Sequence, residues 1–483
     1  MVFSSLIFLY AFFSLSLGAY CLCRTQKAQN IVLLLFSLAF YIWGEPVYVL
    51  LLMFMALVSW GCALGVARAD TQAKKRLWLI AAAVIDIALI GYFKYAGLVC
   101  SIFGPVPAFV KNILLPIGIS FYTFQLLTYV VDVYRGDAQA QKSYWNVLLY
   151  AALFHQCIAG PIVRYKTVDH ELFSGQPRTP ELAEGVSRFA TGLAKKVLLA
   201  NPCGALAESL ILSESAAVDV AASAQALADL PALGAWVGLI AYGMQIYLDF
   251  SAYSDMAIGM GRMLGLHYLE NFDYPYISRS VTEFWRRWHM SLGTFFRDYV
   301  YIPLGGSRCG FLRGLINAFV VWALTGLWHG ASWNFLLWGL WFFVFLMLER
   351  LVLKRVLEKL PVISNLYLLV AVFLGWGLFC YTDLSLFGVL ARSLFGANGN
   401  GFSDWFLELD LKGSMYLLMA SVLACTPLYK VICQKLGRFA HNHGALGKVW
   451  DVVYYAVLPV LFLLLATASL VGDSYNPFIY FQF

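Results

Sequence analysis

The chain has 483 residues, of which 61% are hydrophobic and 12% are charged, and its formal net charge is +6 at pH 7. A soluble domain typically carries about 25% charged residues, so this composition excludes an ordinary soluble protein and indicates a surface that faces a lipid bilayer. A positive charge can signal a nucleic-acid partner, but here the basic residues gather between apolar runs, and we expect no nucleic-acid partner.

Apolar runs recur from the N-terminus to the C-terminus. With their flanks they approach the roughly 20 residues that a spanning helix needs, as at 31–40, 48–66 and 452–470. Because these runs are continuously apolar rather than alternating, they predict helices and not strands. We therefore predict an all-α polytopic membrane protein with about 10–12 transmembrane helices. No long polar linker interrupts the chain, which predicts a single membrane domain over 1–483.

The charges also predict a topology. Basic residues cluster at 24–27, 68–76, 350–359 and 430–448. By the positive-inside bias these clusters face the cytoplasm, which puts the N-terminus outside. The stretches 208–229 and 398–410 contain acids but no Lys or Arg, and we expect both outside.

Ionisable side chains also stand near or within the apolar runs. Each would cost about 2.5–3.5 kcal/mol at the centre of a lipid-exposed helix, so we expect them to face a tunnel or funnel inside the bundle. They are Asp86, Lys94, Asp132, Arg135, Lys195, Lys196, Asp249 and Asp255.

Two polar stretches are candidates for contact with a substrate. In 155–165, HQCIAGPIVRY, the pair Gly160-Pro161 interrupts a helix ahead of Arg164, which could anchor a phosphate or a carboxylate. In 245–259, QIYLDFSAYSDMAIG, four side chains could line the cavity or orient a substrate, namely Asp249, Tyr253, Ser254 and Asp255. For both stretches a structural polar network within the bundle is an equal alternative.

When the stretch 283–300, EFWRRWHMSLGTFFRDYV, is treated as one helix, its charged residues fall on one side and its aromatic residues on the other. Five charges on a spanning helix would cost about 12–17 kcal/mol, so we predict a helix in the membrane interface with its aromatic face toward the membrane. His289 then lies at the seam between the two faces. The charged side holds Glu283, Arg286, Arg287, Arg297 and Asp298, and the other holds Phe284, Trp285, Trp288, Leu292, Phe295, Phe296 and Tyr299.

The stretch 314–348 contains no Asp, Glu, Lys or Arg. As an unbroken helix it would be about 52 Å long, whereas the hydrocarbon core is about 30 Å thick. We therefore predict a break at 326–334, GLWHGASWN, where two glycines weaken the helix and Ser332 or Asn334 can cap a restart. Broken helices at membrane depth face protein or a watery cavity, and His329 stands at this break.

A histidine in such a place can act as a general base, because its unperturbed pKa is near neutrality and an apolar site keeps it uncharged. It can equally bond a neighbouring helix, and position alone leaves both roles open for His329 and His289. No carboxylate or third histidine lies at ligand spacing, and the ten cysteines form no metal pattern, so we expect no metal.

Six stretches carry a resemblance to a known family. They are MVFSS at the start, LPIGISFYTFQ at 115–125, AGPIVRY at 159–165, YLDFSAYSDMAIG at 247–259, ENFDYPYISRSVTEFWRRWHMSLGTFFRDYVYIPLGG at 270–306 and TGLWHGASWNFLLWG at 325–339. In them the chain resembles the membrane-bound O-acyltransferase (MBOAT) family, in its bacterial branch typified by the membrane subunit of alginate O-acetylase. The motif-bearing core is about 115–340, and the run WRRWHMSL followed by LWHGA is highly specific.

The resemblance implies a ring of helices around a thinned centre, in a multi-pass protein of the bacterial inner membrane. It implies catalytic roles for His329 and His289, while the role of His155 stays open. To substrate binding we assign Trp285, Trp288, Asp249, Tyr253, Ser254, Asp255, Trp328, Asn334 and Arg164.

The resemblance further implies transfer of an acetyl group from cytoplasmic acetyl-CoA, without a tightly bound cofactor, toward hydroxyls of an extracytoplasmic polysaccharide. A partner acetyltransferase outside the membrane is expected to complete the transfer. Alginate, cellulose, another exopolysaccharide and peptidoglycan all stay open as acceptors. Two alternatives also stay open, which are D-alanyl transfer to teichoic acid and a transporter or flippase without acyl transfer.

Overall fold

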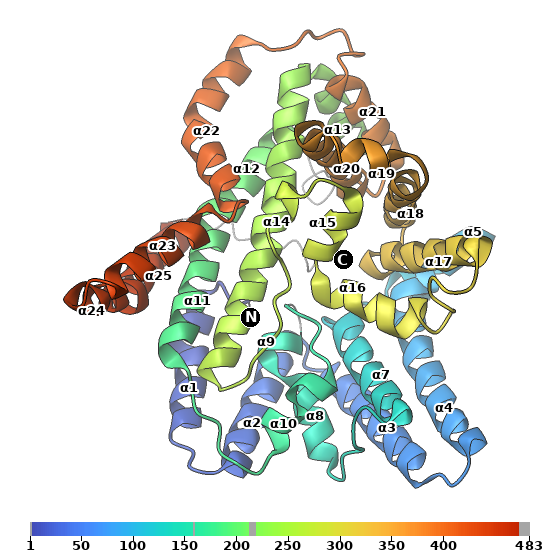
Figure 1. The fold of residues 1–483 in the computed structure, drawn as a ribbon. Helices are drawn as coiled ribbons and strands as arrows, with labels where there is room; N and C mark the ends of the chain where they lie inside the picture. The colour runs from blue at the N-terminus through green and yellow to red at the C-terminus, as the bar shows by residue number, and fades with distance from the viewer. Residues whose placement is uncertain (1, 158–159, 212–218, 473–483) are drawn as a thin grey trace. The chain divides into compact units, whose positions relative to one another are not determined.

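The computed structural model describes residues 2–157, 160–211 and 219–472, and these residues form helices and connecting loops without a strand. The all-α prediction is confirmed. The chain divides into two compact units, Met1–Ala190 with Tyr253–Glu270, and Thr191–Ala252 with Asn271–Phe483. The long helix α14 (Ala232–Met263) contributes residues to both units (Figure 1).

The first unit begins at the N-terminus. Thr25 and Thr71 cap its helices α2 and α4, because each threonine hydroxyl accepts a bond from a backbone N–H of the first turn. Its helices are α1 (Ser14–Cys21), α2 (Gln26–Gly44), α3 (Val49–Arg68), α4 (Gln72–Ile90), α5 (Ala96–Phe103), α6 (Ala108–Lys111), α7 (Ile119–Arg135), α8 (Tyr144–Ala152), α9 (Phe154–Cys157), α10 (Tyr165–Phe173) and most of α11 (Leu182–Ala194).

The second unit holds most of the C-terminal half. A π-helical segment, Lys195–Ala200, leads into its first helix. Besides its part of α14, the helices of this unit are α12 (Asn201–Leu210), α13 (Val220–Asp229), α15 (Val281–Arg287), α16 (Met290–Phe296), α17 (Phe311–His329), α18 (Trp333–Leu348), α19 (Lys354–Leu357), α20 (Pro361–Cys380), α21 (Leu384–Leu394), α22 (Trp405–Ala424), α23 (Leu428–His441), α24 (Ala445–Val452) and α25 (Leu458–Gly472).

Seven helices of the described chain are long and apolar enough to cross a membrane, or up to eight if the bent pair α22 and α23 counts as one span. The protein is therefore a multi-pass membrane protein. The number is lower than the predicted 10–12, because some apolar runs form helices of only 10–17 residues. The spans are Gln26–Gly44, Val49–Arg68, Gln72–Phe103, Phe311–His329, Trp333–Leu357, Pro361–Cys380 and Ala445–Gly472.

The described parts of the two acid-bearing stretches expected outside the membrane come close to each other in the second unit. The Asn398 amide donates to the carbonyl oxygens of Ala228 and Leu230 at 3.0 and 2.7 Å, and α13 packs against α21 (Figure 1). Helix α20 connects this region to the basic stretch 350–359. The sides of the membrane on which these stretches lie stay a prediction.

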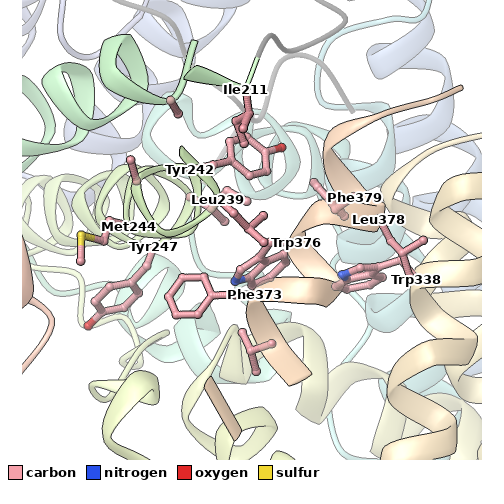
Figure 2. Packing of buried hydrophobic residues seen from close by; sticks show 14 of the residues in the cluster. Ile211, Leu239, Tyr242, Met244, Tyr247, Trp338, Phe373, Trp376, Leu378 and Phe379 are labelled. Atoms are coloured by element: carbon pink, nitrogen blue, oxygen red, sulfur yellow. The ribbon is translucent and has the colours of Figure 1, made fainter. Parts of the chain in front are cut away.

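Aromatic side chains form the core of the second unit. Figure 2 shows residues of α14, α18 and α20 meeting there, among them Tyr247, Trp338 and Trp376. Each is at most 3% exposed. Dense ring packing of this kind fixes the helices relative to one another by van der Waals contact, which drives association where lipid replaces water.

Candidate active site

The apolar stretch 314–348 breaks where the sequence predicts. Helix α17 ends at His329 and α18 begins at Trp333, with Gly330 in extended conformation between them. Ser332 occupies the capping position, but its hydroxyl bonds the Asn334 side chain and caps no backbone N–H. Asn334 is fully buried, and its amide donates to the Leu378 carbonyl at the end of α20 at 3.4 Å.

Glycines bring α17 and α18 into close contact. A Cβ atom on Gly326 would lie 2.3 Å from the Phe335 carbonyl oxygen, and one on Gly339 would lie 2.3 Å from the Trp322 carbonyl oxygen. Small residues allow helix backbones to approach in this way in membranes. The crossing therefore fixes where α17 ends and where its last residue, His329, is held.

His329 sits in an aromatic surround and is 7% exposed. Its ring centroid lies 4.9 Å from that of Trp328, 4.9 Å from that of Trp338 and 5.4 Å from that of Phe379. Three different helices, α17, α18 and α20, supply these rings. Such a surround limits the access of water to the imidazole.

The prediction of one continuous helix over 283–300 is wrong. Helix α15 ends at Arg287 and α16 begins at Met290, and between them His289 adopts the left-handed conformation with φ 44° and ψ 53°. The helix is interrupted because the Met290 N–H bonds the carbonyl oxygen of Asn271, at 2.9 Å, instead of continuing the ladder. A left-handed non-glycine residue costs about 1–3 kcal/mol and is typical of functional sites.

The sequence places His289 at the seam between the charged and the aromatic face. In the structure its side chain is 2% exposed, and its ring lies 4.7 Å, centroid to centroid, from that of Phe250. The aromatic side of the segment does not face lipid either, because Phe284 and Trp288 are buried in the protein core. The charged side is confirmed in part, since Arg287 pairs with Glu283 at 2.9 Å.

A hydrogen-bonded network fixes the His289 ring. Its Nδ1 lies 3.2 Å from the Oδ1 atom of Asn271, which also accepts from the Ser291 N–H at 3.2 Å and the Ser291 hydroxyl at 2.9 Å. Burial lowers the pKa of His289 to about 3, so the ring is neutral at physiological pH. Its Nε2 has no hydrogen-bond partner among the described residues.

One indole connects the two histidines. The Trp328 ring lies 5.8 Å from His289 and 4.9 Å from His329, centroid to centroid. The two helix breaks thus bring both imidazoles against the same side chain, although they stand far apart in sequence. Two imidazoles in one aromatic site are suited to activating a hydroxyl group.

Aromatic side chains of α15, α18 and α20 pack against one another beside this site. We call Trp285, Trp288, Trp338 and Trp376 the aromatic column. At its far end the Glu349 carboxylate accepts the Val281 and Thr282 N–H groups, which holds the start of α15. Trp288 then packs on Trp376 at 4.9 Å, centroid to centroid. Beside it, Trp285 contacts the rings of Trp322, Trp338 and Phe342.

The column follows α20, one of the helices long and apolar enough to cross a membrane. About 21 Å along α20 separates Asn365 from Phe379. The Asn365 amide donates to the Ser278 carbonyl oxygen before α15, and the Phe379 ring contacts His329. The first lies near the basic stretch 350–359 and the second near α21. This distance is about two thirds of the roughly 30 Å thickness of a hydrocarbon core.

Comparison with known proteins identifies the family. The profile described as "MBOAT, membrane-bound O-acyltransferase family" matches residues 109–391, which include both histidines. The chain is 35% identical to the probable alginate O-acetylase AlgI of Pseudomonas putida and 36% identical to that of Pseudomonas aeruginosa, over the full length of both chains in each case. It is 30% identical to the peptidoglycan O-acetyltransferase of Helicobacter pylori, over 70% of this chain and 68% of that one.

The chain belongs to the membrane-bound O-acyltransferase family. The resemblance drawn from the motifs is thereby confirmed, and so is the prediction that this protein is an acyltransferase. The matched range is wider than the predicted core of 115–340 and extends through α20.

Asp249, predicted to contact a substrate, forms an ion pair in this MBOAT protein. Its carboxylate lies 2.8 Å from the Lys196 ammonium, and the two side chains are 2% and 1% exposed. Lys196 comes from the π-helical segment before α12, and Asp249 from α14. The pair joins two elements of the second unit, so a structural role accounts for its burial without a substrate.

A double substitution separates the two roles. Asp249→Asn should destabilise the protein by about 3–5 kcal/mol, because it leaves the Lys196 charge buried without its counter-charge. The double variant Lys196→Met with Asp249→Leu should recover most of that loss, as measured by thermal unfolding in detergent. Recovered stability with normal activity would show a structural role; recovered stability without activity would restore Asp249 to the substrate site.

Other predicted site residues of the MBOAT chain belong to the first unit. Tyr253 stacks on Phe3 with centroids 5.5 Å apart, and Ser254 is buried. The Asp255 carboxylate lies 2.6 Å from Arg188. Arg164 stands at the start of α10. Their roles toward a substrate stay predictions.

His155 also belongs to the first unit. It is fully buried and bonds the hydroxyl of Tyr268. This contact gives the side chain a structural partner, and its role in the reaction stays open.

Three residues that support the site, Asn271, Ser291 and Glu349, were not predicted from the sequence. Asn271 and Glu349 contact segments that are distant in the chain. Ser291 lies just after the break at His289, which the prediction of one continuous helix did not include. The available signal was weak: Asn271 lies within the family motif 270–306, and Ser291 is two residues from His289.

Proposed function

We propose that this protein transfers an acetyl group from cytoplasmic acetyl-CoA toward hydroxyl groups of an extracytoplasmic polysaccharide, in the bacterial inner membrane, with a partner acetyltransferase outside it. The observation that carries the proposal is the meeting of His329 and His289 at Trp328 within an O-acyltransferase chain. Full-length relatives that carry the name alginate O-acetylase support the acetyl group and the polysaccharide.

In the proposed reaction His329 is the general base. A ring nitrogen of His329 takes the proton of the acceptor hydroxyl as the oxygen attacks the thioester carbonyl carbon and forms the new C–O bond. The tetrahedral intermediate then collapses, the C–S bond breaks, and the thiolate of coenzyme A leaves and takes up the proton. His289 accepts a hydrogen bond at Nε2 and positions the acceptor or the donor.

The charge around the far end of the aromatic column supports a phosphate-bearing donor. Arg279, just before α15, and Arg286, in its last turn, are both exposed. At the N-terminus of α15 the Thr282 N–H donates to the Glu349 carboxylate. The basic stretch 350–359 follows Glu349 directly in the sequence. Coenzyme A carries several phosphate charges, which exposed guanidinium groups bind well.

The test is incubation of the purified protein in nanodiscs with acetyl-CoA labelled in the acetyl group. We expect release of coenzyme A and label on an added oligosaccharide, on the partner or on the protein itself. Label retained on His329 after denaturation would change the mechanism to a covalent one. Transfer only of D-alanine from a carrier protein, or flux of a glycan without any acyl transfer, would overturn the proposal.

A further inference from the structure

Resting on the proposed function, we infer that Asn271 is a positioning residue that fixes His289 in the tautomer with its proton on Nδ1. Its side chain comes from the loop after α14, eighteen residues before the histidine, and is fully buried. The inference concerns how the site is prepared for a hydroxyl group and assigns no new chemical step.

The network determines which atom of the Asn271 amide faces the ring. The Ser291 backbone N–H can only donate, and it lies 3.2 Å from the atom of Asn271 that also faces the ring. That atom must therefore be the carbonyl oxygen, which can only accept. The nitrogen of His289 at 3.2 Å from the same oxygen is then the donor.

The tautomer follows directly. With the proton on Nδ1, the lone pair of the neutral imidazole is on Nε2. This atom is buried and has no hydrogen-bond partner among the described residues. The Asn271 oxygen thus leaves Nε2 as the acceptor for a substrate hydroxyl.

Asn271 also shapes the backbone around the histidine. Its carbonyl oxygen accepts the Met290 N–H at 2.9 Å, and its side chain accepts the Ser291 N–H. It therefore satisfies the first N–H groups of α16, which His289 in its left-handed conformation does not cap. A residue with a structural role alone would only satisfy these N–H groups. A test of the positioning role must therefore measure the protonation of the His289 ring itself.

Two substitutions separate these roles. Asn271→Leu keeps the volume but removes the acceptor, so both tautomers of His289 become populated and kcat should fall about 10–100-fold with little change in the KM for acetyl-CoA. Asn271→Asp keeps the acceptor and adds a negative charge, which stabilises the imidazolium. The pKa of His289 should then rise and move the acid limb of the pH–rate profile upward by about 1–3 units.

The direct readout is ¹⁵N NMR of histidine-labelled protein in nanodiscs, with His289→Gln to assign the signal. We expect an unprotonated Nε2 in the natural protein and a mixture of tautomers in Asn271→Leu. Asn365→Leu is the control, since Asn365 donates to the carbonyl oxygens of Tyr276 and Ser278 and has a structural role nearby. This control should lower stability without changing the His289 signal or the pH profile.

The outcomes separate this inference from the proposed function. An unchanged ¹⁵N signal and pH profile in both Asn271 variants would overturn the positioning role while leaving acetyl transfer in place. Acetyl transfer absent from the natural protein, with the tautomer shifted as expected, would overturn the function and keep the positioning role. If Asn271→Leu does not fold, Asn271→Asp alone decides through the pH profile.

Discussion

Replacement of His329 by alanine is expected to abolish acetyl transfer while leaving the protein in the membrane in normal amount. The imidazole is at the end of α17, in van der Waals contact with three aromatic rings and close to the second histidine through Trp328. Loss of a general base lowers rates by about 10²–10⁴-fold, which for a cell's glycan amounts to loss of acetylation. The measurement is the acetyl content of the secreted glycan, normalised to the protein in the membrane fraction.

His441→Ala is the matched control for this prediction. His441 is half exposed on α23, where it lies 3.3 Å from Asp451, and it has no part in the aromatic site. The control removes the same side chain and should leave acetylation unchanged. A His329→Ala protein that still acetylates the glycan at the natural rate would remove the base from the mechanism.

The second large effect is expected at the crossing of α17 and α18. Gly326→Val or Gly339→Val should prevent stable folding of the second unit, because each new side chain would overlap a backbone carbonyl that lies 2.3 Å from the Cβ position. Backbone atoms in two packed helices cannot move aside as a flexible side chain can, so overpacking is costly here. The measurement is the yield of monodisperse protein in detergent, followed by its thermal unfolding temperature.

Gly314 on the same helix provides the control. A Cβ atom there meets nothing within 4 Å, and the residue lies in the first turn of α17. Gly314→Ala should leave yield and unfolding temperature unchanged or slightly raised, because alanine favours helix by about 1 kcal/mol over glycine. Equal losses at Gly314, Gly326 and Gly339 would mean that helix flexibility, and not the close crossing, explains the effect.

The two effects have a common origin in the geometry of the broken helices. The crossing at Gly326 and Gly339 sets the position of the α17 end, and Asn271 sets the conformation of His289 at the second break. Each histidine is thus placed by a residue that has no chemical role. Variants at these supporting positions should reduce activity through geometry and not through loss of a reacting group.

Much of the fold could be predicted from the amino-acid sequence. The apolar runs determined an all-helical, multi-pass membrane protein, since only helices satisfy the backbone of a continuously apolar segment in lipid. The break at 326–334 followed from length, because an uncharged stretch much longer than the bilayer is thick cannot remain one helix. The motifs around His289 and His329 determined the family.

Only the tertiary structure decided how the second histidine is held. Periodicity treats 283–300 as one helix, because every residue type in it is compatible with a helix. The break at His289 arises from a carbonyl oxygen of Asn271, which competes for the Met290 N–H from a distant part of the chain. Likewise, the ion pair between Asp249 and Lys196 joins residues that are far apart in the sequence, so no local pattern predicts it. Sequence patterns record local preference, whereas these contacts are long-range, and long-range contacts are set by the packing of the whole unit.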